Sequence, residues 1–205
     1  MIKSMTILYK VGNNLYINLT NRCPYACTFC LRNSKDSMAD NNDTLWLERE
    51  PEVEEVKLEF SKFNMDEFKE VVFCGYGEPT ERLYDLLEIA KYIKETYNMP
   101  IRINTNGTAN LIWEKDVTQD LEGLIDTLSI SLNTPNAEKY HKLVRSRFGD
   151  KSYEAMLNFA EKAKKYVPNI VMTTVETTIT KEEEKQCQEI CDKMGVKYRI
   201  RPWED

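Results

Sequence analysis

The stretch Leu15–Cys30, LYINLTNRCPYACTFC, places a strand directly before three cysteines. Apolar and polar residues alternate through its first six positions, which is the period of two of a half-buried strand. Cys23, Cys27 and Cys30 then follow with C-x3-C-x2-C spacing. Three thiols at such short intervals cannot easily pair with one another, whereas a loop can bring them together at one point. We therefore expect a metal centre on this loop.

The number of thiols bears on which metal the centre holds. A structural zinc site is normally closed by four protein ligands, and the single histidine, His141, lies more than a hundred residues away in the sequence. An iron–sulfur cluster held by three thiolates, with one iron left open, fits the pattern better than zinc.

A second motif, Gly75-Tyr76-Gly77-Glu78-Pro79, follows the short apolar strand expected at Val71 to Cys74. Two glycines allow backbone to approach a ligand closely, and a carboxylate at such a turn can accept hydrogen bonds from an ammonium group. The motif by itself is also compatible with an ordinary turn between elements.

The remainder of the chain alternates between strands and amphipathic helices. Besides Leu15 to Thr20, we expect strands at Val71–Cys74, Ile101–Asn104, Leu128–Asn133, Ile170–Thr178 and Val196–Pro202. Helices are expected at 51–63, 83–97, 111–123, 153–166 and 181–194, and a further helix is expected to start at Thr134. The polar stretch 32–43 is expected to be mobile. This alternation predicts an α/β fold with a parallel sheet, and six strands are too few for a closed eight-fold barrel.

Several of these strands have one apolar and one polar face. In Ile101–Asn104 the polar face carries Arg102 and Asn104, and Thr174, Glu176 and Thr178 share a face of the fifth strand. A filled parallel barrel is apolar on both faces, so we expect the polar faces to line a cavity. An antiparallel sheet with one solvated face gives the same alternation, but the long helical connections argue against it.

These motifs together resemble the radical S-adenosylmethionine (SAM) superfamily. The resemblance rests on the cysteine spacing, with Phe29 before the last cysteine, and on the glycine-rich turn after the second strand. It implies an open (β/α)6 partial TIM barrel and a [4Fe-4S] cluster on Cys23, Cys27 and Cys30. It also implies that SAM chelates the open iron and is cleaved to a 5′-deoxyadenosyl radical.

The resemblance also implies contacts to SAM. Gly75 to Glu78 stand where the family has Gly-Gly-Glu-Pro, which holds the methionine amino group, with Tyr76 replacing one glycine. The family places ribose and carboxylate contacts at Ser131 and Asn133, whereas Val175–Thr178 departs from its adenine motif. The cofactor contacts expected on this basis are Phe29, Gly75, Tyr76, Gly77, Glu78, Asn104, Ser131, Asn133 and Glu176.

More narrowly, the residues around the cysteines and Leu45–Glu48 resemble the radical SAM subgroup associated with TatD-type nucleases. No substrate follows from that likeness. The expected function is a radical SAM enzyme acting on a small molecule or a protein, with a flavodoxin- or ferredoxin-type electron donor. The alternatives are an activase that generates a glycyl radical on a partner enzyme, and a non-catalytic electron carrier.

The last strand carries two arginines on one face, Arg199 and Arg201. We expect them to face the cavity with Glu176 and to hold an anionic or polar substrate, since unpaired guanidinium groups there need a partner. The alternative is an edge strand whose arginines reach solvent.

Composition sets the remaining expectations. The chain has 205 residues and a net charge of −6, so we expect a single domain and no general affinity for nucleic acid or anionic membranes. It shows no membrane span or targeting segment, and six cysteines without a secretion signal favour the cytoplasm. Cys187 and Cys191 fall on one helical stripe and are expected in the core.

Overall fold

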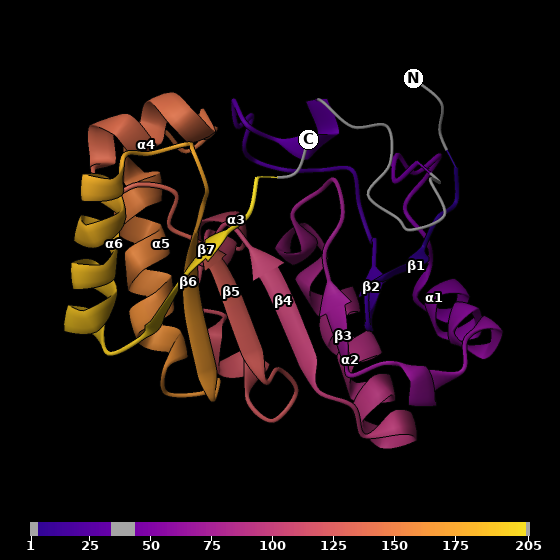
Figure 1. The fold of residues 1–205 in the computed structure, drawn as a ribbon. Coiled ribbons are helices and arrows are strands. Elements are labelled where there is room, and N and C mark those ends of the chain that lie inside the picture. Colours follow the sequence, from indigo (N-terminus) through magenta and orange to yellow (C-terminus); the bar gives the residue numbers. More distant parts are fainter. Residues whose placement is uncertain (1–3, 34–43, 204–205) are drawn as a thin grey trace.

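The computed structural model describes residues 4–33 and 44–203, and its centre is a single sheet of seven strands. The strands lie side by side in the order in which they occur in the chain, so the sheet is open (Figure 1). Their bounds are β1 Leu8–Val11, β2 Asn14–Ile17, β3 Glu70–Phe73, β4 Ile101–Thr105, β5 Thr127–Ser131, β6 Asn169–Val175 and β7 Lys197–Arg201.

The six strands from β2 to β7 are all parallel, which confirms the α/β class and the open partial barrel. The first strand, β1, was not expected, and it pairs antiparallel with β2 from Leu8↔Ile17 to Val11↔Asn14. Gly12 makes the tight turn between them possible, because it adopts a φ of 57°.

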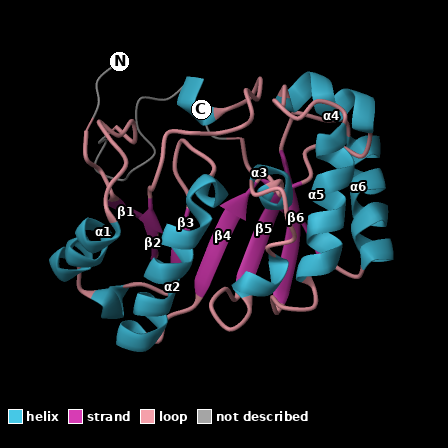
Figure 2. Cartoon of the chain, turned by 180° about the vertical axis from the view of Figure 1, so that it is seen from behind, coloured by secondary structure: helices cyan, strands magenta, loops and turns pink. Residues whose placement is uncertain are grey.

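Helices cover one face of the sheet, as the view from behind in Figure 2 shows. Their bounds are α1 Val53–Glu59, α2 Leu83–Tyr97, α3 Ala109–Ile112, α4 Ala137–Val144, α5 Lys151–Ala163 and α6 Lys181–Met194. Each of the later parallel strands follows a helical connection of the expected kind. No helix in the described ranges has the length and apolar character needed to span a membrane.

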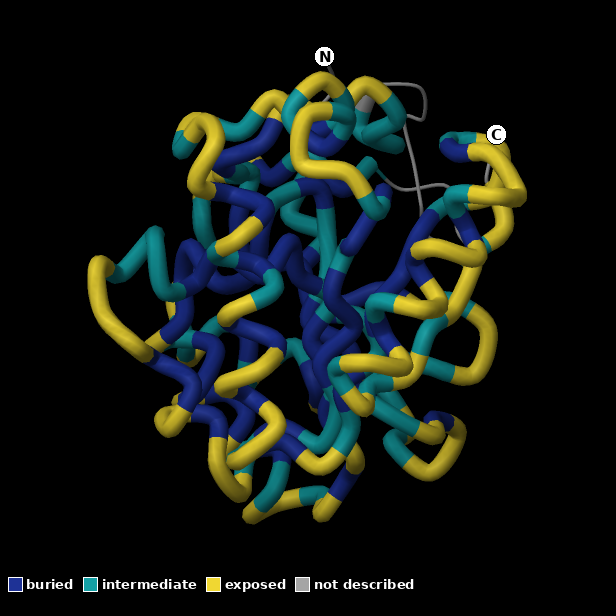
Figure 3. Tube along the Cα trace, turned by 90° about the vertical axis from the view of Figure 1, so that its left-hand side faces the viewer, coloured by how far each residue is buried: buried dark blue, intermediate teal, exposed yellow. Residues whose placement is uncertain are grey.

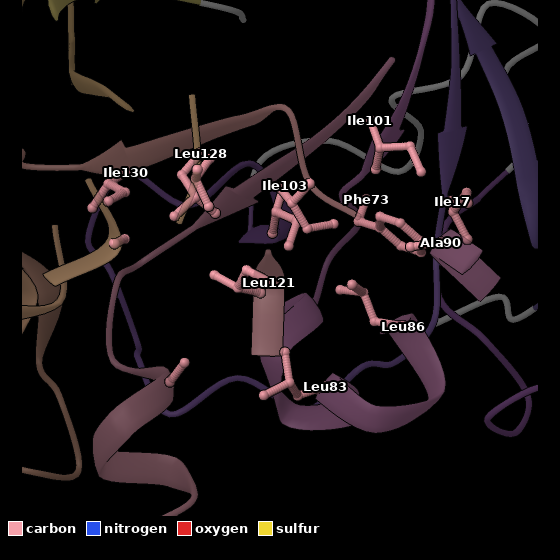
Figure 4. Close-up of a cluster of buried hydrophobic side chains, with 14 of the residues drawn as sticks. Ile17, Phe73, Leu83, Leu86, Ala90, Ile101, Ile103, Leu121, Leu128 and Ile130 are labelled. Carbon is pink, nitrogen blue, oxygen red and sulfur yellow. The ribbon is translucent and has the colours of Figure 1, made fainter. Parts of the chain in front are cut away.

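The core lies between this helical layer and the sheet. The helix-facing side chains of the central strands, such as Phe73, Ile103 and Leu128, have no exposed surface, and Leu86 of α2 packs in the same cluster (Figure 4). The buried segments run through the centre of the molecule in Figure 3. Cys187 and Cys191 belong to this core, as expected from their helical stripe.

Two expected elements end early. The helix expected at 111–123 is interrupted because Glu114 adopts a left-handed φ of 54°, and it consists of α3 and a short 3-10 turn at Thr118–Leu121. The strand expected to reach Thr178 ends at Val175, and Thr177 is left-handed with a φ of 67°. Most of the polar stretch 32–43 lies outside the described residues.

Candidate active site

A cavity of about 510 Å³ lies on the sheet face that the helices leave uncovered, at the carboxyl ends of the strands. The cysteine loop and the last residues of the described chain border it, and both lie beyond the arrowheads of the strands in Figure 1. The residues expected at the site that line this cavity are Cys23, Cys27, Phe29, Cys30, Gly75, Tyr76, Gly77, Glu78, Asn104, Ser131, Asn133, Arg199 and Arg201.

Glu176 is the one expected site residue outside the cavity lining. It follows the end of β6 and is exposed. The residues of β6 that face the helices include Met172 and Thr174, whereas Thr173 and Val175 have the opposite orientation. The expectation that Thr174, Glu176 and Thr178 form a cavity-facing row is therefore wrong, and no described carboxylate of this strand reaches the arginines of β7.

The cysteine loop is held by backbone hydrogen bonds to the end of α4. The amides of Ala26 and Thr28 donate to the carbonyls of Val144 and Leu143 at 3.0 and 2.9 Å. Beneath the loop, the hydroxyl of Tyr25 lies 3.0 Å from that of Tyr140 on α4. These contacts give the loop its shape without using any thiol.

The three thiols of the loop are partly buried, and none forms a disulfide. Burial raises the pKa of Cys23 and of Cys27 to about 12. The expectation that they meet at one point is not met, because no three His, Cys or carboxylate side chains of the described residues are grouped to hold one metal ion.

An iron–sulfur cluster requires a different arrangement of the three thiols from that required by a single metal ion. Each thiolate ligates its own iron, so the three sulfurs need to surround a shared space rather than a single ion. Cys23, Cys27 and Cys30 all border the same cavity and come from one loop. This donor set of three thiols beside an open cavity fits an iron–sulfur cluster with one iron left for another ligand.

The glycine-rich turn after β3 packs against the segment that leads into the cysteines. A Cβ at Gly75 would lie 2.2 Å from Oδ1 of Asn18, and one at Gly77 would lie 2.2 Å from the carbonyl oxygen of Thr20. The amide of Glu78 donates to the carbonyl of Arg22 at 2.8 Å. The side of these glycines where a Cβ would stand therefore faces the protein's own chain, while both glycines also line the cavity.

The carboxylate of Glu78 is buried, with 3% of the residue exposed, and accepts four hydrogen bonds. Oε1 accepts from the amide and hydroxyl of Thr80 at 3.1 and 2.7 Å and from the hydroxyl of Thr105 at 2.7 Å, while Oε2 accepts from the amide of Asn106 at 2.8 Å. Burial raises the pKa of Glu78, against the lowering effect of these donors. The side chain thus ties the end of β3 to the end of β4.

Three buried polar atoms of cavity-lining residues have no hydrogen-bond partner among the described residues. They are Nδ2 of Asn106, Oδ1 of Asn133 and Nε of Arg201. Asn133 also adopts a left-handed φ of 63°, which is uncommon for a residue other than glycine. Buried polar groups are normally paired, so these atoms fit a cavity whose ligand supplies the partners. This donor and acceptor set suits a polar cofactor such as SAM.

Sequence reasoning missed other residues of the cavity. Tyr16, Arg32 and Trp203 line it, as do Arg102, identified only as part of a polar strand face, and Cys74, identified only as the end of an apolar strand. The position of Arg102 follows from the alternation of β4, and Cys74 directly follows the last residue of β3. Nothing in the sequence pattern indicated that the chain end at Trp203 returns to the cavity.

A second hollow, of about 370 Å³, lies beside α2 and carries mainly charged residues that pair with one another. Arg22 contacts Glu50 at 2.7 Å, and Arg82 contacts Asp85 at 2.7 Å. Because the arginines of this hollow are already paired with carboxylates, the cavity with the cysteines is the stronger candidate for a ligand site.

The sequence profile of the Radical SAM superfamily matches residues 17–194. The chain belongs to the radical SAM superfamily. It is therefore an enzyme of a family that uses SAM and an iron–sulfur cluster, and the cavity described above is the part of this radical SAM domain where the three cysteines lie.

The relatives of this radical SAM protein differ in what they are named for. A protein of Thermococcus kodakarensis named "Probable GTP 3',8-cyclase" is 32% identical over 155 residues, which are 75% of this chain and 44% of the relative. A Clostridium novyi protein named "Probable dual-specificity RNA methyltransferase RlmN" is 27% identical over 67% of this chain and 38% of the relative. The chain spans less than half the length of these curated relatives.

The fold of the radical SAM domain is also found among solved structures. Streptococcus suis SuiB bound to S-adenosylmethionine matches with a TM-score of 0.67 at 17% identity, over 94% of this chain and 41% of SuiB. This likeness shows that the open sheet with its helical layer is a fold shared with a protein whose solved structure contains S-adenosylmethionine.

Proposed function

We propose that the protein holds a [4Fe-4S] cluster on Cys23, Cys27 and Cys30 and reductively cleaves SAM, so that a hydrogen atom is abstracted from a substrate in the cavity. When bound, the cluster supplies the electron that breaks a carbon–sulfur bond of SAM, giving methionine and a 5′-deoxyadenosyl radical. The electron comes from a small reductant protein of flavodoxin or ferredoxin type. Six cysteines without a disulfide suit the reducing cytoplasm.

One observation carries this proposal. The three thiols, the turn around Glu78 and the unpartnered polar atoms of Asn106 and Asn133 all border one cavity of about 510 Å³. That volume is within the range of small-molecule sites. An electron carrier needs a cluster but has no use for a cavity with unpaired polar groups, so an enzyme explains more of the site.

The chain's own residues would position SAM in this cavity. Asn106 Nδ2 is a buried donor and Asn133 Oδ1 a buried acceptor, and each gains a partner when a polar ligand enters. Glu78 holds the ends of β3 and β4 in register around that ligand, and its carboxylate adds negative charge where the amino group of methionine is expected. Phe29 and Tyr76 supply apolar surface to the lining of the cavity.

The test is the formation of 5′-deoxyadenosine. Anaerobically reconstituted and chemically reduced protein, incubated with SAM, is expected to release 5′-deoxyadenosine and methionine, measured by chromatography. The Cys27→Ala variant is expected to release neither, whereas Cys187→Ala, altered in the core, keeps the reaction. Release of 5′-deoxyadenosine at equal rates by the parent and Cys27→Ala would contradict the proposal.

The choice of substrate is a separate matter. The relatives are named for a nucleotide cyclase and an RNA methyltransferase, so membership of the superfamily selects no substrate. The alternative function is an activase that generates a glycyl radical on a partner enzyme. Membership of the TatD-associated radical SAM subgroup stays a prediction. Formation of 5′-deoxyadenosine that depends on a protein partner would favour the activase.

A further inference from the structure

We infer that Arg199 and Arg201, together with Arg102, bind a doubly charged anionic group of the substrate, for which a phosphate is the best match. This inference rests on the proposed function in that it assigns a substrate to the same cavity. Arg102 comes from β4 and the other two from β7, and all three line the cavity.

The three arginines differ in their partners. Arg102 is fixed, because its Nη2 donates to Oε1 of Glu70 at 2.7 Å and its Nη1 to Oδ1 of Asn104 at 2.9 Å. Arg199 has one long contact, from Nη2 to the hydroxyl of Ser129 at 3.4 Å. Nε of Arg201 is buried with no partner, and no carboxylate of the described residues forms an ion pair with Arg199 or Arg201.

The same residues repel one another electrostatically. Burial lowers the pKa of Arg199, and the neighbouring charges of Arg102 and Arg201 lower it further. Unpaired like charges held in one wall disfavour the empty cavity, and an anion bound among them removes that repulsion. Because Arg199 is exposed toward the cavity and Arg201 half-buried, both guanidinium groups are placed to receive a ligand.

The charge of the bound anionic group is inferred from the charged side chains around the cavity. Arg32, Arg102, Arg199 and Arg201 line the cavity. Together with Glu78 in the lining and Glu70 beside Arg102, they leave an excess of two positive charges, on a chain whose net charge is −6. A single carboxylate neutralises half of that excess, whereas a phosphate monoester carries about −1.5 to −2 at pH 7. Its three oxygens can also accept hydrogen bonds from more than one guanidinium group at once, whereas a carboxylate offers only two oxygens.

Inorganic phosphate serves as the probe in the experiment. Calorimetric titration of the cluster-reconstituted protein is expected to show phosphate binding, at least about ten-fold tighter than acetate. Arg199→Met and Arg201→Met are each expected to weaken it by about ten- to a hundred-fold, the value of a charge-assisted hydrogen bond. Lys197→Met is the matched control, since Lys197 lies on the same strand and face but outside the cavity lining. Absence of binding to the parent, or an equal loss in Lys197→Met, overturns the inference.

A second measurement tests whether the arginines bind an anionic group of the substrate or the carboxylate of SAM. If the arginines serve the substrate, the affinity of both arginine variants for SAM stays within about two-fold of the parent, and phosphate and SAM bind together. Competition between phosphate and SAM, with loss of SAM affinity in the variants, overturns the inference and assigns the arginines to the cofactor. Phosphate binding is measured without turnover, so failure to form 5′-deoxyadenosine would count against the proposed function alone.

Discussion

At the scale of single residues, the cysteines of the loop differ from the other buried thiols in their surroundings. Cys27 borders the cavity, while Cys187 has no exposed surface and packs in the core. We expect Cys27→Ala, purified and reconstituted anaerobically, to lose the brown colour and most of the iron. Cys187→Ala is expected to keep its iron and to lose on the order of 1 kcal/mol in free energy of unfolding. Full iron content in Cys27→Ala would show that the cluster is not held by this loop.

Glu78 has two effects that substitution can separate. Glu78→Ala is expected to weaken SAM binding by roughly ten- to a hundred-fold, because a charge-assisted bond to the amino group is worth about 1.5–3 kcal/mol. It also leaves the hydroxyl of Thr105 and the amide of Asn106 without their acceptor, which costs on the order of 2 kcal/mol in stability.

Glu78→Gln is the control for shape. It keeps one acceptor oxygen, which can still serve the donors of Thr80 and Thr105, but it removes the charge and places an NH2 group opposite the amide of Asn106. It is therefore expected to lose SAM affinity with a smaller loss of stability than Glu78→Ala. Calorimetry with SAM and urea unfolding measure the two effects independently. If Glu78→Ala binds SAM as tightly as the parent, Glu78 serves only to connect β3 and β4.

At the scale of elements, the turn after β3 and the cysteine loop form one packed unit. We expect Gly77→Ala to lower both the stability, by about 1–3 kcal/mol, and the iron uptake, because the new Cβ meets backbone oxygens of Thr20 and Arg22. Gly123→Ala is the control, because a Cβ at this position has no atom within 4 Å. It is expected to lower the free energy of unfolding by only about 1 kcal/mol, the cost of placing alanine at a φ of 72°. The measurements are urea unfolding and iron content.

The two glycine variants are distinguished by iron. A parent-like iron content in Gly77→Ala would show that the turn does not position the cysteines. A reduced iron content in Gly123→Ala would show that general destabilisation, and not local packing, controls the uptake of the cluster.

Elements with strict periodicity could be predicted from the sequence. The strand around Ile103, the helix α2 and the cavity-facing positions of Arg199 and Arg201 all follow from periods of 2 and 3.6. The two turn residues Gly12-Asn13 between Leu8–Val11 and Asn14–Ile17 are also a local signal, and they identify β1 when the two segments are interpreted as a hairpin.

Contacts between elements could not be predicted in this way. The partners of Glu78 lie on a neighbouring strand end, and the glycines of the turn are explained by chain segments about 55 residues away in sequence. The placement of Glu176 depended on where β6 ends, and a strand boundary is set by tertiary packing more than by local composition. Specific pairings of this kind emerge only when the sheet is assembled.

At the scale of the whole molecule, a single core joins all parallel strands to the helical layer. Residues from β2 through β6 and from α1 through α6 belong to one hydrophobic cluster. We therefore propose that residues 1–205 form one domain and expect one cooperative transition in urea, with coincident tryptophan fluorescence and circular dichroism curves. Two separated transitions would show that the sheet consists of independently stable parts.

The attachment of the cysteine loop to α4 bears on how the enzyme matures. The amides of Ala26 and Thr28 and the hydroxyl of Tyr25 hold the loop through contacts that involve no sulfur ligand. We therefore expect the loop to keep this shape when no cluster is bound. If the proposed cluster is lost to oxygen, we expect iron and sulfide to restore it on the folded protein, without a new round of synthesis.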